Sequence, residues 1–283
     1  MILVIGGTGR IGSRVVQQLA DLGLPLRVLA RRPEAALALP GGVEAAPGDL
    51  DQPDSLPAAF AGISSVFLLT TQSPRQEAQE RAAIAAARAA GVAHVVKVSA
   101  GDAATALDSP TPVGRAHAAA EAALKASGLL WTILRPSAFM QVALEPLLDG
   151  ARDSGRLLLP LGKARVAFIN VDDIARAAVW ALTHPQAAAS RTLVLTGPEA
   201  LGLPELARLA SQAFGRPVKA VSPPMLLVRM IIGRRITDPF LRRHQLALLG
   251  LMRAGRLAEV SPDLALTTGQ AGRSVAQWLA DRA

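Results

Sequence analysis

The chain has 283 residues, enough for one large α/β domain with an elaborated second lobe. With 51% hydrophobic and 18% charged residues, its composition is globular and excludes a disordered chain. The net charge of +8 comes from basic residues that look scattered, and with 3% aromatic residues and no stacking or zinc-finger pattern we expect no nucleic-acid partner. The absence of cysteine excludes disulfides, thiolate chemistry and cysteine-bound metals.

Three further features restrict the class of protein. The four histidines lie far apart without ligand spacing, so we expect no metal site. The first residues read as a core strand, which leaves no room for a signal peptide. The longest apolar stretch, near Met225, is broken by Arg229 and is too short to cross a bilayer. We therefore expect a cytoplasmic protein, monomeric or homodimeric, without a membrane partner.

A glycine-rich turn follows the first apolar run. Residues 2–5 predict a buried strand, and apolar residues at helical spacing predict a helix over residues 10–22. Such a turn between strand and helix holds the pyrophosphate of a dinucleotide. Gly6 permits the tight turn, Gly9 lets the backbone approach the phosphates, and Gly12 lets helix and strand pack closely. The expected cofactor-binding residues here are Gly6, Thr8, Gly9, Arg10, Ile11 and Gly12.

The second predicted strand, residues 26–30, ends at two arginines. Sites that prefer NAD place an acidic residue here for the ribose 2′-hydroxyl, but this chain has no acid before Glu34. The guanidinium groups of Arg31 and Arg32 suit a 2′-phosphate in charge and in geometry. The sequence therefore predicts NADP(H), against the alternative of a solvated basic turn.

Strand and helix signals then alternate, which predicts right-handed crossovers and a Rossmann-type, doubly wound parallel sheet. Further strands are expected at residues 43–46, 65–69, 92–98 and 129–134, and helices at residues 54–60, 76–90 and 113–127. Ligands of such sheets bind beyond the carboxyl ends of the strands. That edge would gather the glycine turn, Arg31, Asp49, Thr70–Ser73 and Ser99.

The pattern loosens after Pro136. Helices are expected at residues 139–148 and 172–182, short strands at 156–160 and 166–170, and a strand at 192–195 that rejoins the main sheet. Helical segments dominate from Pro204 onward. We therefore expect a dinucleotide-binding domain over residues 1–155, with a strand and helix returning near 165–198, and a smaller, mainly helical substrate lobe over most of 156–283.

Together these landmarks resemble the NmrA-like branch of atypical short-chain dehydrogenases/reductases. The matching segments are GGTGRIG at 6–12, ARR at 30–32, GDLDQPDSL at 48–56, HAAAEAALKASGLLWTILRPSAFMQ at 117–141 and VDDIARA at 171–177. The resemblance covers about the first 200 residues and is loose in the last 80. It implies that Asp49 and Leu50 flank the adenine and that Thr70, Thr71 and Gln72 run beside the ribose and pyrophosphate. Ser99, placed at the same sheet edge by its position after a strand, is also expected to bind the cofactor.

The chain departs from the superfamily in its catalytic pair. Short-chain reductases normally use a Tyr-x-x-x-Lys pair, but this chain contains no tyrosine, and alignment places Val113 and His117 at those two positions. The resemblance puts His117 beside the nicotinamide ribose, where it would hold the ribose or donate a proton. The alternative is a buried structural histidine, since it shares an inward helix face with Val113, Ala120 and Leu124.

Other candidates are weaker. Lys97 alternates within a strand, Ser99 fits a loop-lining role better than a catalytic one, and Lys125 falls on the solvent side of its helix. Phe139, Met140 and Gln141 follow the sixth strand and are expected to wall the substrate site, with core packing as the alternative.

Two functions remain open at this level. The first is an NADPH-dependent oxidoreductase that delivers hydride to a quinone, dye or similar conjugated acceptor, as the resemblance to quinone and triphenylmethane reductases implies. Such acceptors stabilise the developing anion themselves, so the loss of the tyrosine is tolerable. The second is a non-catalytic NADP(H) redox sensor that acts through a protein partner.

Overall fold

The computed structural model describes residues 1–32, 34 and 39–282, and a seven-stranded sheet organises much of it. The strand order is β3-β2-β1-β4-β5-β6-β9, and the pairings among the first six strands are parallel. The order 3-2-1-4-5-6 is that of a Rossmann-type sheet, as predicted. The strands are β1 (Ile2–Ile5), β2 (Leu26–Ala30), β3 (Glu44–Pro47), β4 (Ser65–Leu68), β5 (His94–Val98), β6 (Leu130–Pro136) and β9 (Arg191–Leu195).

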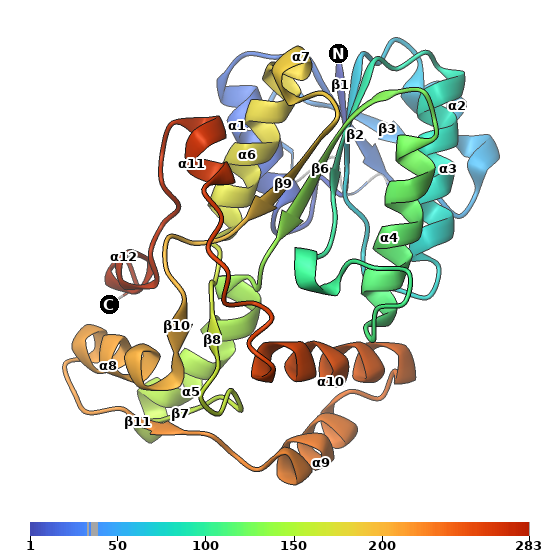
Figure 1. Ribbon diagram of the computed structural model, residues 1–283. Helices are drawn as coiled ribbons and strands as arrows, with labels where there is room; N and C mark the ends of the chain where they lie inside the picture. Colours follow the sequence, from blue (N-terminus) through green and yellow to red (C-terminus); the bar gives the residue numbers. More distant parts are fainter. Residues whose placement is uncertain (33, 35–38, 283) are drawn as a thin grey trace. The chain divides into compact units, whose positions relative to one another are not determined.

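By their contacts the residues form two compact units, and the first holds most of this sheet. It comprises residues 1–100, 115–135 and 174–193. In Figure 1, helices α1 and α6 lie on one side of the sheet and helices α3 and α4 on the other. The helices are α1 (Gly12–Asp21), α2 (Pro57–Phe60), α3 (Gln76–Ala89), α4 (Pro112–Lys125), α6 (Val171–Thr183) and α7 (Pro185–Ala188).

One hydrophobic core lies between the sheet and helices α2, α3 and α4. Alternate residues of neighbouring strands point into it, such as Leu3, Val66, Val95 and Ile133. Lys97 lies two residues after Val95 and pairs in register with Ile133, so it occupies the same face. The sheet register thus directs a charged side chain toward helices α3 and α4.

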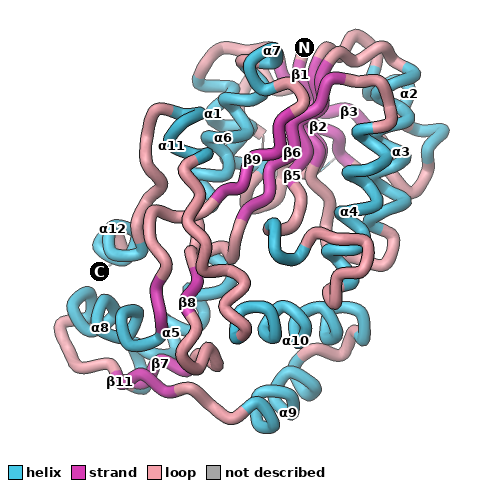
Figure 2. The backbone as a smooth tube through the Cα atoms, viewed as in Figure 1, coloured by secondary structure: helices cyan, strands magenta, loops and turns pink. Residues whose placement is uncertain are grey.

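The second unit comprises residues 101–114, 136–173 and 194–283. Its buried centre includes Met140, Phe168 and Trp278. Figure 2 shows that helix and loop dominate its later part, as the sequence predicted. Its strands and helices are α5 (Glu145–Ser154), β7 (Arg156–Leu158), β8 (Arg165–Val166), β10 (Leu201–Gly202), α8 (Leu203–Phe214), β11 (Lys219–Val221), α9 (Met225–Arg235), α10 (Pro239–Arg253), α11 (Asp263–Thr268) and α12 (Val275–Ala280).

The predicted helix over residues 54–60 was wrong in detail. The chain forms a 3₁₀ turn at Pro53–Ser55 and then the short helix α2, with Pro57 at its start. Proline lacks the backbone N–H that a helix interior needs, and it is tolerated at the first helical position. The proline therefore divides the segment in two.

Two expectations between β6 and α6 also required correction. Phe139 is extended, Met140–Leu144 form a π-helical turn, and α5 starts only at Glu145, just before Pro146. The expected strand over residues 166–170 reduces to β8, with Ile169 making only an isolated bridge to Phe139. Tertiary contacts within the second unit replace the regular pairing that the apolar run predicted.

Candidate functional site

The glycine turn after β1 has a geometry that only glycine permits at two positions. Gly6 has φ +80°, and a Cβ there would lie 2.5 Å from the carbonyl oxygen of Leu69. A Cβ on Gly12 would lie 2.0 Å from the carbonyl oxygen of Gly6. The amide of Gly9 donates to that same oxygen at 3.0 Å, which closes the turn. Strand, turn and helix α1 therefore pack with no room for side chains, as predicted.

The start of helix α1 is open to an anion. No side chain caps its N-terminus, and its first turn contains no acidic residue. The helix dipole and the first backbone N–H groups favour negative charge at this point. Thr8, Gly9 and Arg10 in the turn are exposed, whereas Ile11 and Gly12 are buried. A glycine cradle before an uncapped helix fits a dinucleotide pyrophosphate.

The predicted residues beyond β2 and β3 lie at the same end of the sheet, because both strands are parallel to β1. Arg31 and Arg32 follow β2 and are exposed. Asp49 follows β3 and is half-buried, and its Oδ1 accepts a hydrogen bond from the amide of Asp51 at 3.0 Å. Leu50 packs partly against the core described above. The arginines are thus the most accessible of these groups.

The segment after β4 lies against the glycine turn, through the close approach of Leu69 to Gly6. Thr71 and Gln72 are exposed there. Thr70 is half-buried, and its hydroxyl donates to Glu80 Oε1 at 2.8 Å. Thr70 therefore links the predicted cofactor edge to a buried polar cluster.

That cluster joins β5 to helices α3 and α4. Lys97 Nζ lies 2.8 Å from Glu80 Oε2, and both side chains are 0% exposed. The ammonium also lies 2.8 Å from His117 Nδ1 and donates to the carbonyl oxygen of Val98 at 3.1 Å. The side chain of His117 is 7% exposed. The structure thus brings His117 together with a lysine that the sequence ranked as a weak candidate.

The charges in the cluster follow from its contacts. Burial raises the pKa of Glu80, but Lys97 and His117 outweigh burial and lower the pKa to about 2. Burial and the neighbouring Lys97 charge lower the pKa of His117 below its usual value, although Glu80 opposes this shift. At neutral pH Glu80 is a carboxylate and His117 is a neutral imidazole.

The two ring nitrogens of His117 contact different side chains. An ammonium group has three N–H donors and no acceptor, and Lys97 directs them at Glu80, His117 and Val98. Nδ1 of His117 therefore accepts from Lys97. Nε2 of His117 lies 2.9 Å from Nε2 of Gln76, the amide nitrogen that also donates to Glu80 Oε1 at 3.3 Å. Both ring nitrogens of His117 thus contact buried side chains.

Sequence reasoning missed Gln76 and Glu80 altogether. Both are 0% exposed on helix α3, four residues apart and hence on one face. The available signal was a glutamate within an alanine-rich helix and a lysine within an otherwise apolar strand. Neither alone predicts that the two side chains meet.

Ser99 is also part of a buried network. Its hydroxyl donates to Glu121 Oε1 at 2.6 Å, and Arg135 pairs with both oxygens of that carboxylate, at 3.1 and 2.6 Å. A bidentate arginine with a further hydroxyl donor holds Glu121 firmly. Lys125, by contrast, is exposed as expected. The role of Ser99 toward a cofactor stays a prediction.

A protein family described as NAD(P)H-binding matches residues 6–185, which include the glycine turn and the buried cluster. The chain belongs to this family. The predicted nicotinamide cofactor is thereby confirmed at the level of NAD(P)H. Among the described residues, no group of three or more acidic, histidine or cysteine side chains is placed to hold a metal ion.

Relatives of this NAD(P)H-binding protein include proteins named as reductases. NAD(P)H azoreductase of Xenophilus azovorans is 41% identical over 223 residues, 78% of this chain and 77% of that protein. The (4-alkanoyl-5-oxo-2,5-dihydrofuran-3-yl)methyl phosphate reductase of Streptomyces griseus is 35% identical over 286 residues, 100% of this chain and 98% of that protein. Both similarities agree with the resemblance to NmrA-like atypical short-chain dehydrogenases/reductases.

Solved structures confirm the fold. Triphenylmethane reductase of Citrobacter sp. complexed with NADP(H) has a TM-score of 0.88 at 24% identity, covering 99% of each chain. The NADPH-dependent quinone oxidoreductase of Escherichia coli complexed with NADPH has a TM-score of 0.88 at 23% identity, covering 100% of this chain and 99% of that chain. At these identities the likeness establishes the Rossmann-type architecture.

The three predicted substrate-site residues lie in the second unit. Met140 is 0% exposed within the core of that unit. The side chain of Gln141 is buried, donating to Asn170 Oδ1 at 3.0 Å and accepting from the amide of Val171 at 3.2 Å. Phe139 is half-buried. Core packing accounts for Met140 and Gln141, and a substrate wall stays a prediction.

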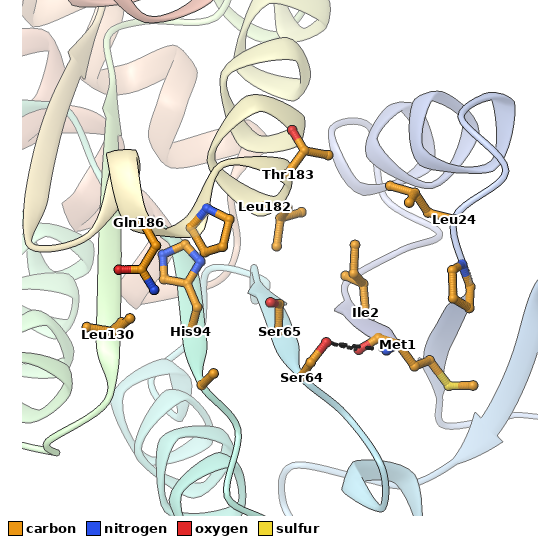
Figure 3. Close-up of a pocket in the computed structure, with 13 residues that line it drawn as sticks. Met1, Ile2, Leu24, Ser64, Ser65, His94, Leu130, Leu182, Thr183 and Gln186 are labelled. Atoms are coloured by element: carbon orange, nitrogen blue, oxygen red, sulfur yellow. Dashed lines mark hydrogen bonds between the residues drawn. The ribbon is translucent and has the colours of Figure 1, made fainter.

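A pocket of about 440 Å³ opens at the other end of the sheet (Figure 3). It is lined by the first residues of four strands, Ile2, Ser65, His94 and Leu130, and by residues next to helix α7. Ligands of doubly wound sheets bind at the carboxyl ends of strands, where the glycine turn lies. We therefore place the functional site at the glycine turn and not in this pocket.

His94 makes stability depend on pH. Burial lowers its pKa to about 4, and its Nε2 lies 2.9 Å from the hydroxyl of Thr132. Between pH 6.5 and 4 the unfolded chain binds a proton that the folded chain does not, so stability falls as pH falls, by about 3 kcal/mol for this group. We expect His94→Gln to flatten this slope in urea unfolding followed between pH 7 and 4.5.

The matched control for this prediction is His184→Gln, because His184 is exposed. Its slope is the reference with which the slope of His94→Gln is compared. An equal slope in wild type and His94→Gln would contradict the assignment of the buried neutral histidine.

Proposed function

We propose that the protein is an NADPH-dependent reductase that transfers hydride to an electron-poor conjugated acceptor. The observation that carries the proposal is the glycine cradle before an uncapped helix, within the segment that matches the NAD(P)H-binding family. Support comes from relatives named as reductases of an azo compound and of an unsaturated, acylated lactone. The first name specifies an azo group, which is an N=N double bond, and the second a C=C double bond conjugated with carbonyl groups.

The chain contains no tyrosine, so no phenolic acid assists the reaction. The reduced nicotinamide, when bound, supplies the hydride. A conjugated acceptor delocalises the charge that develops on hydride addition, so the residues of the protein need mainly to bind, orient and exclude water. The glycine turn and helix α1 hold the pyrophosphate, and His117 holds the ribose or gives a proton.

The test is stopped-flow oxidation of NADPH with a panel containing an azo dye, a quinone and an acylated unsaturated lactone. We expect at least one acceptor to be reduced well above its uncatalysed rate. No acceleration with any acceptor, despite tight cofactor binding, would overturn the reductase proposal and favour a redox-sensing role.

The cofactor preference has its own test in Arg31 and Arg32. If their guanidinium groups hold the 2′-phosphate, the double substitution Arg31→Ala, Arg32→Ala should weaken NADPH binding at least tenfold, by loss of charge-assisted hydrogen bonds. NADH lacks that phosphate and should lose little. Calorimetric titration of both cofactors decides between these outcomes. Equal losses of affinity for NADPH and NADH would show that the arginines supply only a diffuse positive field. The assignment of NADP(H) as the preferred cofactor would then be refuted.

His117 is expected to act in the reaction. His117→Leu should lower the kcat for NADPH oxidation by about 10²-fold if the ring donates a proton. If the ring instead holds the ribose, the main effect should be a weaker affinity for NADPH. Kinetic measurements with parallel calorimetry separate the two roles. Unchanged kcat and affinity in a folded variant would leave His117 a structural residue.

A further inference from the structure

Helix α9 in the second unit exposes an apolar face. Its sequence, MLLVRMIIGRR, is apolar on most sides, yet Val228 is its one buried residue. The side chains of Leu226, Leu227, Met230 and Ile231 are 82%, 42%, 49% and 40% exposed, and we call these four residues the α9 face. At about 100° per residue they fall within an arc of about 140°, so they form one continuous surface.

The net positive charge of the chain lies in the sequence segment that contains this helix. Residues 216–258 contain nine of the 30 lysines and arginines but only one of the 22 acidic residues, Asp238. Their net charge of +8 equals that of the whole chain, so the other 240 residues are neutral on balance. The basic residues themselves are spread along the chain, with 21 of the 30 outside this segment, but the net positive charge is confined to it. Total composition concealed a strongly cationic segment.

Five arginines lie on α9 and the first half of α10. They are Arg229, Arg234, Arg235, Arg242 and Arg243. Within the part of the chain that the structure describes, none of these five arginines makes an ion pair. Helical periodicity places Arg234 on the same arc as the α9 face, one turn beyond Met230 and Ile231. An arginine there keeps its charged end at a polar boundary while its stem covers apolar surface.

We propose that α9 and the start of α10 dock on an anionic lipid surface. The α9 face would enter the boundary between headgroups and acyl chains, and the arginines would contact the anionic headgroups. No helix in the described part of the chain is long and apolar enough to cross a membrane. This surface differs from the glycine turn and needs no reductase activity.

The charge also argues against other occupants. A two-fold contact with a second copy would bring the same cationic segment onto itself, where like charges repel. Nucleic acid would attract the arginines but leaves the α9 face without a partner, because α9 contains no aromatic residue for stacking. An anionic lipid surface satisfies both features at once.

The test is flotation of the full-length protein with phosphatidylcholine vesicles, with and without phosphatidylglycerol. We expect binding only to the vesicles that contain phosphatidylglycerol, weakened by salt. Leu226→Ser, Met230→Ser and, separately, Arg234→Ser, Arg235→Ser should each reduce partitioning about tenfold or more. Leu266→Ser, on α11 with 75% exposure, is the matched control and should bind as wild type.

Because the altered side chains are exposed, each variant is expected to fold. Circular dichroism and NADPH titration verify this. Absence of binding to anionic vesicles would overturn the proposal, as would equal loss in the Leu266 control. Sedimentation measures whether the protein is a monomer or a dimer, which tests the alternative of a second copy on the α9 face. A stable dimer that the double substitution in α9 dissociates would show instead that a second copy covers this face.

Discussion

Lys97→Met is expected to lower the free energy of unfolding by about 3–5 kcal/mol, because it leaves a buried carboxylate without its cation. Lys97 and Glu80 are both 0% exposed, and the ammonium contacts Glu80 Oε2 and His117 Nδ1 at 2.8 Å each. Methionine fills a similar volume but offers no charge and no donor. Urea unfolding at pH 7 measures the loss.

The pH dependence gives a second readout. Without Lys97, burial dominates and the pKa of Glu80 should rise above its usual value. A group with a raised folded pKa stabilises the fold below its unfolded pKa and loses that contribution as pH rises. The deficit of Lys97→Met relative to wild type should therefore be larger at pH 7 than near pH 4.5.

Two controls accompany this variant. Lys125→Met removes a lysine whose side chain is 42% exposed and 4.0 Å from Glu121, and it should change stability little. The double variant Lys97→Met, Glu80→Gln removes both charges and should recover part of the loss. A loss in Lys97→Met no greater than in Lys125→Met would refute the buried ion pair.

Gly12→Ala is expected to damage stability and cofactor binding together. The new Cβ would lie 2.0 Å from Gly6 O, 2.7 Å from Gly6 C and 2.9 Å from Gly7 Cα, all of them backbone atoms. Backbone cannot rotate aside as a side chain can, so the turn and helix α1 must separate, at a cost of about 1–3 kcal/mol. We expect NADPH affinity to fall at least tenfold, the equivalent of one lost charge-assisted hydrogen bond.

The control is another glycine to alanine change in open space. A Cβ on Gly150, within helix α5, would meet nothing within 4 Å. Since alanine favours helix more than glycine does, Gly150→Ala should be neutral or stabilise by up to about 1 kcal/mol. Calorimetric titration with NADPH and urea unfolding of both variants provide the comparison. Normal NADPH binding by Gly12→Ala would contradict the cradle.

The sequence alone was sufficient for the local structure of the cofactor edge. The apolar run before Gly6, the glycine spacing and the helical periodicity beyond Gly12 all depend on residues close in sequence. Backbone conformation and periodicity are local properties, so they predict strand, turn and helix without knowledge of distant contacts. The predicted helices over residues 54–60 and 139–148 were wrong in their bounds because they ignored a local feature, the prolines at positions 57 and 146.

The tertiary structure decided which distant side chains meet. Glu80, Lys97 and His117 come from α3, β5 and α4, and each has a plausible separate interpretation: an exposed helix charge, a strand lysine and a buried histidine. Sheet register turns Lys97 toward the helices, and helical phase turns Glu80 and His117 toward the sheet. In the low-dielectric interior these charges must pair, because an unpaired buried charge costs too much free energy.

The cationic segment was determined partly by the sequence and partly by the tertiary structure. The excess of arginine over residues 216–258 can be counted in the sequence, yet an apolar helix such as α9 is normally expected in a core. Only the structure showed that Leu226 and Met230 are exposed beside unpaired arginines. Sequence determines how apolar a helix is, whereas burial depends on whether other elements of the fold cover it.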